Sequence, residues 1–75
     1  MKFKKLRKVI LQTECISINT NADNEYVHEA YLNIDRVPND YDNYEVINIS
    51  SVSGIAVPKA LDVVFDGIGI TLKKK

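Results

Sequence analysis

The densest group of side chains able to do chemistry lies in the segment RVPNDYDNYEVINI, residues 36–49. Its Asp40, Asp42 and Glu45 offer hard oxygen ligands of the kind that Ca²⁺ prefers. A calcium loop of the EF-hand type also needs a central glycine and a glutamate at its twelfth position, and this segment has neither. We therefore expect no metal site here. The segment instead predicts a polar turn whose tyrosine rings pack on the core while their hydroxyls stay in water.

One cysteine and one histidine, Cys15 and His28, are the candidates for nucleophilic chemistry or for soft metal ligation. A four-coordinate zinc site needs more such ligands, and a nucleophilic site needs a third residue that orients the base. In the expected strands, Cys15 lies opposite Ile16 and Ile18, whereas His28 lies on the apolar face, so the two do not share a site. The three glycines fit turns better than a phosphate loop. The sequence therefore predicts no enzymatic activity, metal or cofactor.

Binding is the remaining class of function, and an acidic stretch is its first candidate. Residues 14–45 hold eight acidic residues against Arg36 alone, a net charge of −7. Carboxylates that project from one side can mimic phosphates for a basic groove, and tyrosines are common at the centres of interfaces. The alternative is an ordinary solvated surface. The predicted partner-binding residues are Tyr31, Asp40, Tyr41, Asp42 and Tyr44.

The two ends of the chain are basic and favour a competing function, the binding of nucleic acid. Eight of the ten basic residues lie in the first eight and the last three positions, where no acidic residue occurs. If the ends converge, they form a patch that binds nucleic acid in a salt-dependent way. A third hypothesis is an oligomer that sequesters a small nucleotide, with tyrosines stacked on the base. The candidate nucleic-acid-binding residues are Lys4, Lys5, Arg7, Lys8, Lys73 and Lys74.

A short amphipathic helix is predicted over residues 2–11, with a strand from about residue 7 as the alternative. The helix is favoured because four apolar residues recur at spacings of three or four positions: Phe3, Leu6, Val9 and Ile10.

Alternation of apolar and polar residues predicts three strands, over residues 14–20, 25–34 and 45–52. The first two form a hairpin around the turn residues 21–24, and each exposes one face to solvent. Pro38 offers no backbone donor, so it ends the second strand and suits a single helical turn over residues 39–44. Ser53-Gly54 is expected to end the third strand.

The clearest turn signal is Asp66-Gly67, a preferred type I′ pair within LDVVF-DG-IGITL. The predicted hairpin pairs six apolar residues on one face: Phe65 with Ile68, Val63 with Ile70, and Leu61 with Leu72. The expected fold is α+β, a short N-terminal helix packed on an antiparallel sheet of about five strands, in one small domain over residues 1–75. The apolar face and the edge strands predict a homo-oligomer.

The order of these motifs resembles a loose group of short α+β proteins encoded by bacterial phages and mobile elements. The resemblance rests on T-E-x-I-x-I at residues 13–18, V-P at residues 37–38 and E-V-x-x-I at residues 45–49, and it spans roughly residues 6–65. It implies an accessory protein of a mobile element, without implying a reaction. Together with the acidic stretch, it leads us to expect a non-enzymatic interaction module that inhibits a host or defence protein.

The expected compartment is the cytoplasm. A single cysteine permits no disulfide within the chain, which fits a reducing environment. The apolar run from Val9 to Leu11 is too short for a signal peptide. No stretch approaches the ~20 apolar residues of a membrane span, so we expect no membrane contact.

Overall fold

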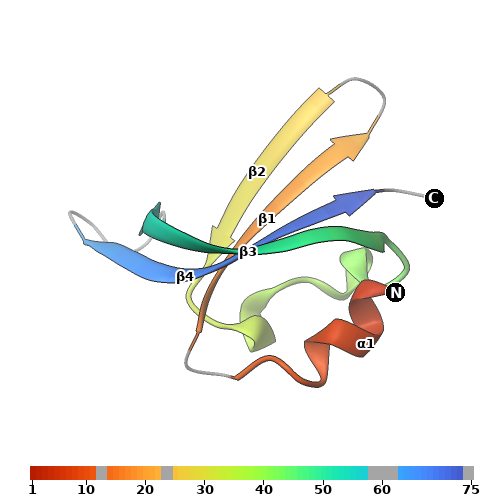
Figure 1. Ribbon diagram of the computed structural model, residues 1–75, viewed down its shortest axis with the longest axis horizontal. Helices are drawn as coiled ribbons and strands as arrows, with labels where there is room; N and C mark the ends of the chain where they lie inside the picture. The colour runs from red at the N-terminus through yellow and green to blue at the C-terminus, as the bar shows by residue number, and fades with distance from the viewer. Residues whose placement is uncertain (12–13, 23–24, 58–62, 74–75) are drawn as a thin grey trace.

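The computed structural model describes residues 1–11, 14–22, 25–57 and 63–73. These residues form a short helix and four strands, the α+β class expected from the sequence with one strand fewer (Figure 1). In chain order the elements are the helix α1 (Phe3–Arg7), the strands β1 (Cys15–Ala22) and β2 (Glu25–Tyr31), the 3₁₀ turns η1 (Ile34–Arg36) and η2 (Asn39–Tyr41), and the strands β3 (Glu45–Ala56) and β4 (Val64–Lys73).

The sheet is mixed, in the order β2-β1-β4-β3, and two antiparallel hairpins lie side by side in it. The first hairpin, β1–β2, is confirmed, and its turn at residues 23–24 lies outside the described residues. The inner strands β1 and β4 run parallel, from Cys15 opposite Gly67 to Thr20 opposite Leu72. The prediction of a wholly antiparallel sheet is therefore wrong at its centre.

The predicted closing hairpin at Asp66-Gly67 is also wrong, because both residues lie inside the ten-residue strand β4. Gly67 lies where β4 passes the backbone of β1. A Cβ atom at this position would lie 2.1 Å from the carbonyl oxygen of Cys15. The glycine thus permits a close strand approach rather than a turn. The true partner of β4 in a hairpin is β3, and Leu61 of the predicted register lies outside the described residues.

Strand β3 continues past Ser53-Gly54, where the sequence predicted its end. The register with β4 shifts between Val52 and Ile55, which marks a β-bulge. Gly54 occupies this bulge with a φ of 72°, a left-handed conformation that glycine adopts without strain. The sequence therefore predicted the position of an irregularity at Ser53-Gly54 correctly, but this irregularity is a bulge within β3 and does not end the strand.

Helix α1 is confirmed but shorter than predicted. Phe3 and Leu6 are buried, whereas Val9 is 73% exposed and lies beyond the end of the helix. The predicted helical turn after Pro38 is present as η2. Both α1 and the η1–η2 segment lie on the same side of the sheet (Figure 1).

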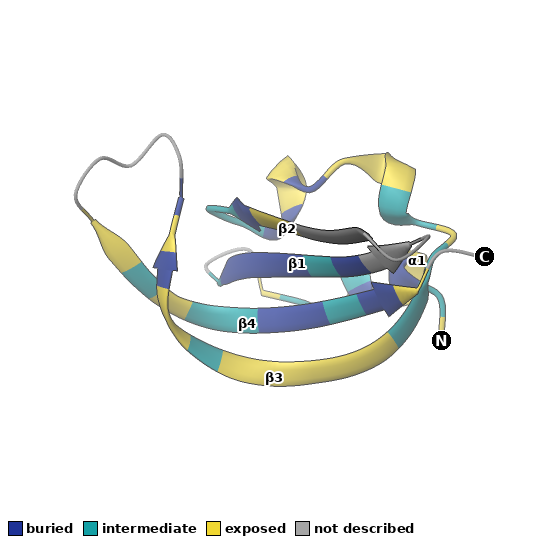
Figure 2. Ribbon diagram, turned by 90° about the horizontal axis from the view of Figure 1, so that it is seen from above, coloured by how far each residue is buried: buried dark blue, intermediate teal, exposed yellow. Residues whose placement is uncertain are grey.

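Strand β1 is buried on both faces, which corrects the expectation of a half-buried strand. Ile16 and Ile18 face the helix, and Cys15 and Ser17 are buried on the other side. The second face is covered because the far end of the β3–β4 hairpin curls over it (Figure 2). The helix-side core consists of Phe3, Leu6, Ile16, Ile18, Ile34, Val37, Ile70 and Leu72, and the smaller second core of Cys15, Ala30, Ile55 and Val57.

Among the described residues, no helix has the length and apolar character required to cross a membrane.

Candidate partner-binding surface

The three tyrosines predicted to bind a partner come together from separate segments. Tyr31 ends β2, Tyr41 lies in η2, and Tyr44 precedes β3. The rings of Tyr41 and Tyr44 meet edge to face, with centroids 5.4 Å apart and planes at 86°. The side chain of Tyr41 also lies close enough to Tyr31 to affect the pKa of the Tyr31 phenol. All three rings are half-buried against the helix-side core, so their positions are fixed while part of each stays accessible.

Two exposed carboxylates flank this cluster. The pKa of Tyr31 is raised to about 12, first by burial, then by Tyr41, and then by the negative charges of Glu29 and Asp40. The Tyr31 phenol therefore stays neutral at physiological pH and retains its proton. Glu29 was not among the predicted site residues. Strand alternation nevertheless places it on the same face as Tyr31, because it precedes Tyr31 by two positions in β2. We name Glu29, Tyr31, Asp40, Tyr41 and Tyr44 the tyrosine surface.

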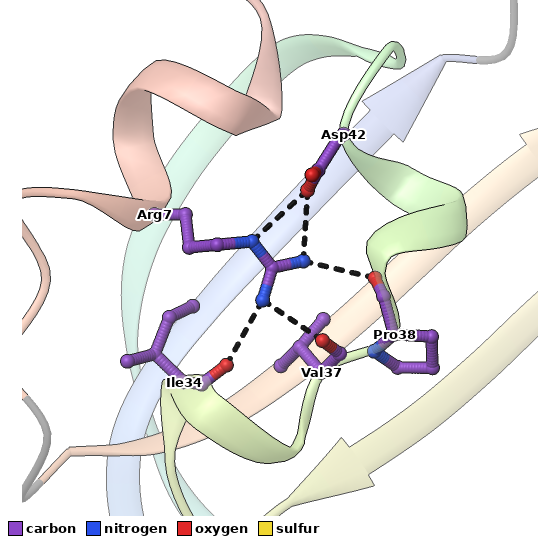
Figure 3. Close-up of polar contacts among 5 residues, drawn as sticks. All are labelled: Arg7, Ile34, Val37, Pro38 and Asp42. Carbon is purple, nitrogen blue, oxygen red and sulfur yellow. Dashed lines mark hydrogen bonds and ion pairs between the residues drawn. The ribbon is translucent and has the colours of Figure 1, made fainter.

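Asp42 differs from Asp40 because it is held by Arg7 of α1 (Figure 3). The Nε and Nη2 atoms of Arg7 each lie 2.9 Å from Oδ1 of Asp42. The other guanidinium donors bind three carbonyl oxygens of the loop: Ile34 at 3.1 Å, Val37 at 2.8 Å and Pro38 at 2.9 Å. All three nitrogens of the Arg7 guanidinium thus have partners inside the chain.

The same guanidinium lies over the ring of Phe3, with its Cζ atom 4.9 Å from the ring centroid. The side chains of Arg7 and Asp42 are only 19% and 25% exposed. This Arg7 clamp ties α1 to the η1–η2 segment, which carries part of the tyrosine surface. Arg7 and Asp42 were predicted to bind nucleic acid and a partner, respectively, and the structure gives both an internal role.

The basic ends do meet beside one residue, Glu45 at the start of β3. The N-terminal amino group and Lys2 Nζ lie 3.2 Å and 3.6 Å from its carboxylate oxygens. Lys73 lies opposite Glu45 in the register of β3 with β4. Lys2 Nζ also donates to the carbonyl oxygen of Asn43 at 2.9 Å. Of the other candidates, Lys4, Lys5, Lys8 and Lys73 are exposed, and Lys74 lies outside the described residues.

Cys15 and His28 lie on the same side of the sheet, which corrects the predicted facing. His28 pairs with Asn19 across the hairpin, four positions along β1 from Cys15. The thiol of Cys15 is buried, donates to the carbonyl oxygen of Tyr31 at 3.3 Å, and has its pKa raised by burial. His28 Nδ1 lies 2.7 Å from Asn19 Oδ1 and 3.4 Å from Ser17 Oγ, so one nitrogen makes both contacts.

Among the described residues, no group of three or more histidine, cysteine, aspartate or glutamate side chains is placed to hold a metal ion. Comparisons with protein-family models, curated proteins and solved structures give no match.

Proposed function

We propose that this protein is a non-enzymatic interaction module that binds a basic protein through the tyrosine surface. The observation that carries the proposal is the convergence of Tyr31 and Tyr41 with the exposed carboxylates of Glu29 and Asp40. Within the described residues, neither carboxylate has an ion-pair partner, in contrast to Asp42. Charges left unpaired beside fixed aromatic rings are suited to a partner from outside.

The chemistry of this surface favours arginine on the partner. A guanidinium can bind a carboxylate such as that of Asp40 through two parallel hydrogen bonds and stack on the face of a tyrosine ring. Because the rings pack on the core, little side-chain freedom is lost on binding. An arginine-rich groove usually binds the phosphates of nucleic acid. The most specific form of the proposal is therefore an inhibitor of a nucleic-acid-handling host or defence protein, encoded by a mobile element and acting in the cytoplasm.

Nucleic-acid binding through the exposed lysines is the second candidate. The supporting observation is that Met1, Lys2 and Lys73 all lie at Glu45, beside the start of the helix α1 that carries Lys4 and Lys5. Lys2 and Arg7 bond to groups of the same chain, which reduces the positive charge available to bind phosphates. Fewer phosphate contacts lower both the affinity and its salt dependence.

A binding experiment with two defined probes separates the candidates. The first probe is a fluorescent arginine-rich peptide and the second a DNA duplex of random sequence. We expect the peptide to bind, and the double substitution Glu29→Gln with Asp40→Asn to weaken it about threefold to tenfold, as two exposed ion pairs would. Asp35→Asn, an exposed acid on η1, is the control and should have a smaller effect.

Two results would contradict the proposal. Equal losses from Asp35→Asn and from either site substitution would show that only net charge attracts the peptide. Binding of the duplex alone, abolished by Lys4→Gln with Lys5→Gln, would favour the lysine-rich ends. A host protein retained on the immobilised wild type, released by a large excess of the peptide, and not retained by the double variant would then identify the partner.

A further inference from the structure

Beyond Glu45, the outer edge of β3 is long and carries no charge. Strand β3 spans Glu45–Ala56 and bonds only to β4 within the sheet, so its other side is an edge (Figure 2). Residues 46–56 include neither a charged residue nor a proline. Natural sheets protect exposed edges with charges, proline, bulges or a covering segment. In β3, the register with β4 is regular over Asn48–Val52 and shifts at a bulge on either side of it. We name Asn48–Val52 the open edge.

The opposite edge of the sheet is protected in the usual way. Strand β2 is only seven residues long and carries Glu25 and Glu29. Two copies of β2 paired about a two-fold axis would bring carboxylates close together, which is unfavourable. Two copies of the open edge would bring together only asparagine, isoleucine, serine and valine. The two edges of this sheet therefore differ in their suitability for self-pairing.

The chain itself shows that the edge of β3 accepts an antiparallel strand. Lys2 forms an antiparallel bridge with Glu45, and the Val46 amide donates to the carbonyl oxygen of Met1 at 2.8 Å. The N-terminal segment then leaves the edge at Phe3 to begin α1. Beyond Val46, no backbone hydrogen bond reaches the outer edge of β3 from the described residues.

We propose that a second copy of this chain occupies the open edge. Antiparallel pairing of β3 with β3 about a two-fold axis at Ser50 would join two four-stranded sheets into one continuous sheet. The pairing would also shield Ile47 and Ile49, which are 57% and 45% exposed. A standard interface covers ~800 Å² per partner. This area is about a sixth of the 5175 Å² surface of the monomer. The five paired residues of the open edge bury a smaller area than that. The dimer is therefore weak and dissociates on dilution.

The first test is the molar mass in solution, measured by sedimentation over a wide dilution series. Ile49→Lys places like charges close to each other across the two-fold axis. Val9→Lys is the matched control, because it also replaces an exposed β-branched residue by lysine but lies outside the sheet. We expect the wild type and Val9→Lys to approach twice the mass of one chain at high concentration, and Ile49→Lys to remain monomeric. A wild type that stays monomeric throughout, or an Ile49→Lys protein that dimerises equally well, would overturn the proposal.

A second test does not depend on the folding of Ile49→Lys. Cα atoms directly opposite in antiparallel strands lie about 4.5–5.5 Å apart, within the range that a disulfide can bridge. Ser50→Cys should therefore form a covalent dimer with oxidised glutathione. Ser53→Cys, exposed but about 20 Å from its counterpart in this register, should not. Cys15 is buried and does not compete. Equal cross-linking at both positions would exclude the proposed register.

Discussion

The Arg7 clamp and the open edge of β3 represent opposite ways of treating polar groups. At the clamp, every nitrogen of one guanidinium contacts an acceptor of the same chain, and α1 is thereby tied to the loop before β3. At the open edge, the backbone groups of Asn48–Val52 that point away from β4 have no partner among the described residues. Polar groups satisfied internally specify the fold, whereas those left at the surface are available to specify a partner.

This difference separates residues that look alike in the sequence. Arg7 lies in a run of four lysines, and Asp42 lies two positions after Asp40. Within each group, one residue forms the clamp, whereas Lys4, Lys5, Lys8 and Asp40 are exposed. If the comparison is correct, substitutions at the clamp reduce stability, and substitutions at its exposed neighbours or at the open edge do not.

The largest effect is expected for Arg7→Ala. The substitution leaves the carbonyl oxygens of Ile34 and Val37 and the carboxylate of Asp42 without their donor in a partly buried site. Loss of one member of such a network typically costs about 3 kcal/mol. For a domain of this size that lowers the Tm by on the order of 15 °C.

Thermal and chemical denaturation of Arg7→Ala measure this effect, with Lys4→Ala as the control. Lys4 lies on the same helix and is exposed, so its side chain should contribute within about 0.5 kcal/mol. If both variants lost the same stability, net charge rather than the clamp would stabilise the N-terminal region.

A smaller effect is expected for Asp42→Asn, which keeps the shape and one acceptor oxygen but removes the charge. We expect a loss of about 1 kcal/mol in the free energy of unfolding, because the hydrogen bonds to Arg7 persist without charge assistance. Asp40→Asn and Ser51→Ala, at the tyrosine surface and the open edge, should change stability by less than about 0.5 kcal/mol. The sequence alone gave no reason to treat Asp40 and Asp42 differently. A stability of Asp42→Asn equal to that of Asp40→Asn would remove the distinction between them.

Local patterns in the sequence predicted the local parts of the fold. Helical spacing identified Phe3 and Leu6 as core residues, and alternation located the β1–β2 hairpin. The parallel pairing of β1 with β4 has no local signal, because it joins residues some fifty positions apart, as Cys15 and Gly67 are. The Asp66-Gly67 turn failed because contact with β1 outweighed its local preference for a turn.

The candidate site was predictable to a similar degree. Tyrosines and acids in one stretch indicated the surface. Which of them stay exposed and which are bonded inside the chain depended on contacts made across the fold. One signal for the clamp was present: Arg7 is the only arginine in the basic run, and a planar guanidinium binds several acceptors at once where an ammonium binds fewer.

A small effect at neutral pH is expected for Tyr31, which lies between the two extremes because it is half-buried against the core yet belongs to the tyrosine surface. Burial raises its pKa in the folded state from 10.0 to about 12. Below pH 10 the phenol is protonated in both the folded and the unfolded chain, so its contribution to stability is constant. As the pH rises from about 10 to about 12, the unfolded chain ionises first, and stability falls.

An ultraviolet titration of tyrosinate should therefore show a late step that Tyr31→Phe removes. The same variant should lose less stability than the wild type between pH 10 and pH 12. Because the phenol is neutral at pH 7, Tyr31→Phe removes no charge there and should change stability by about 0.5 kcal/mol or less. A late step that persists in Tyr31→Phe would assign the raised pKa to another tyrosine, and the centre of the tyrosine surface would have to be reassigned.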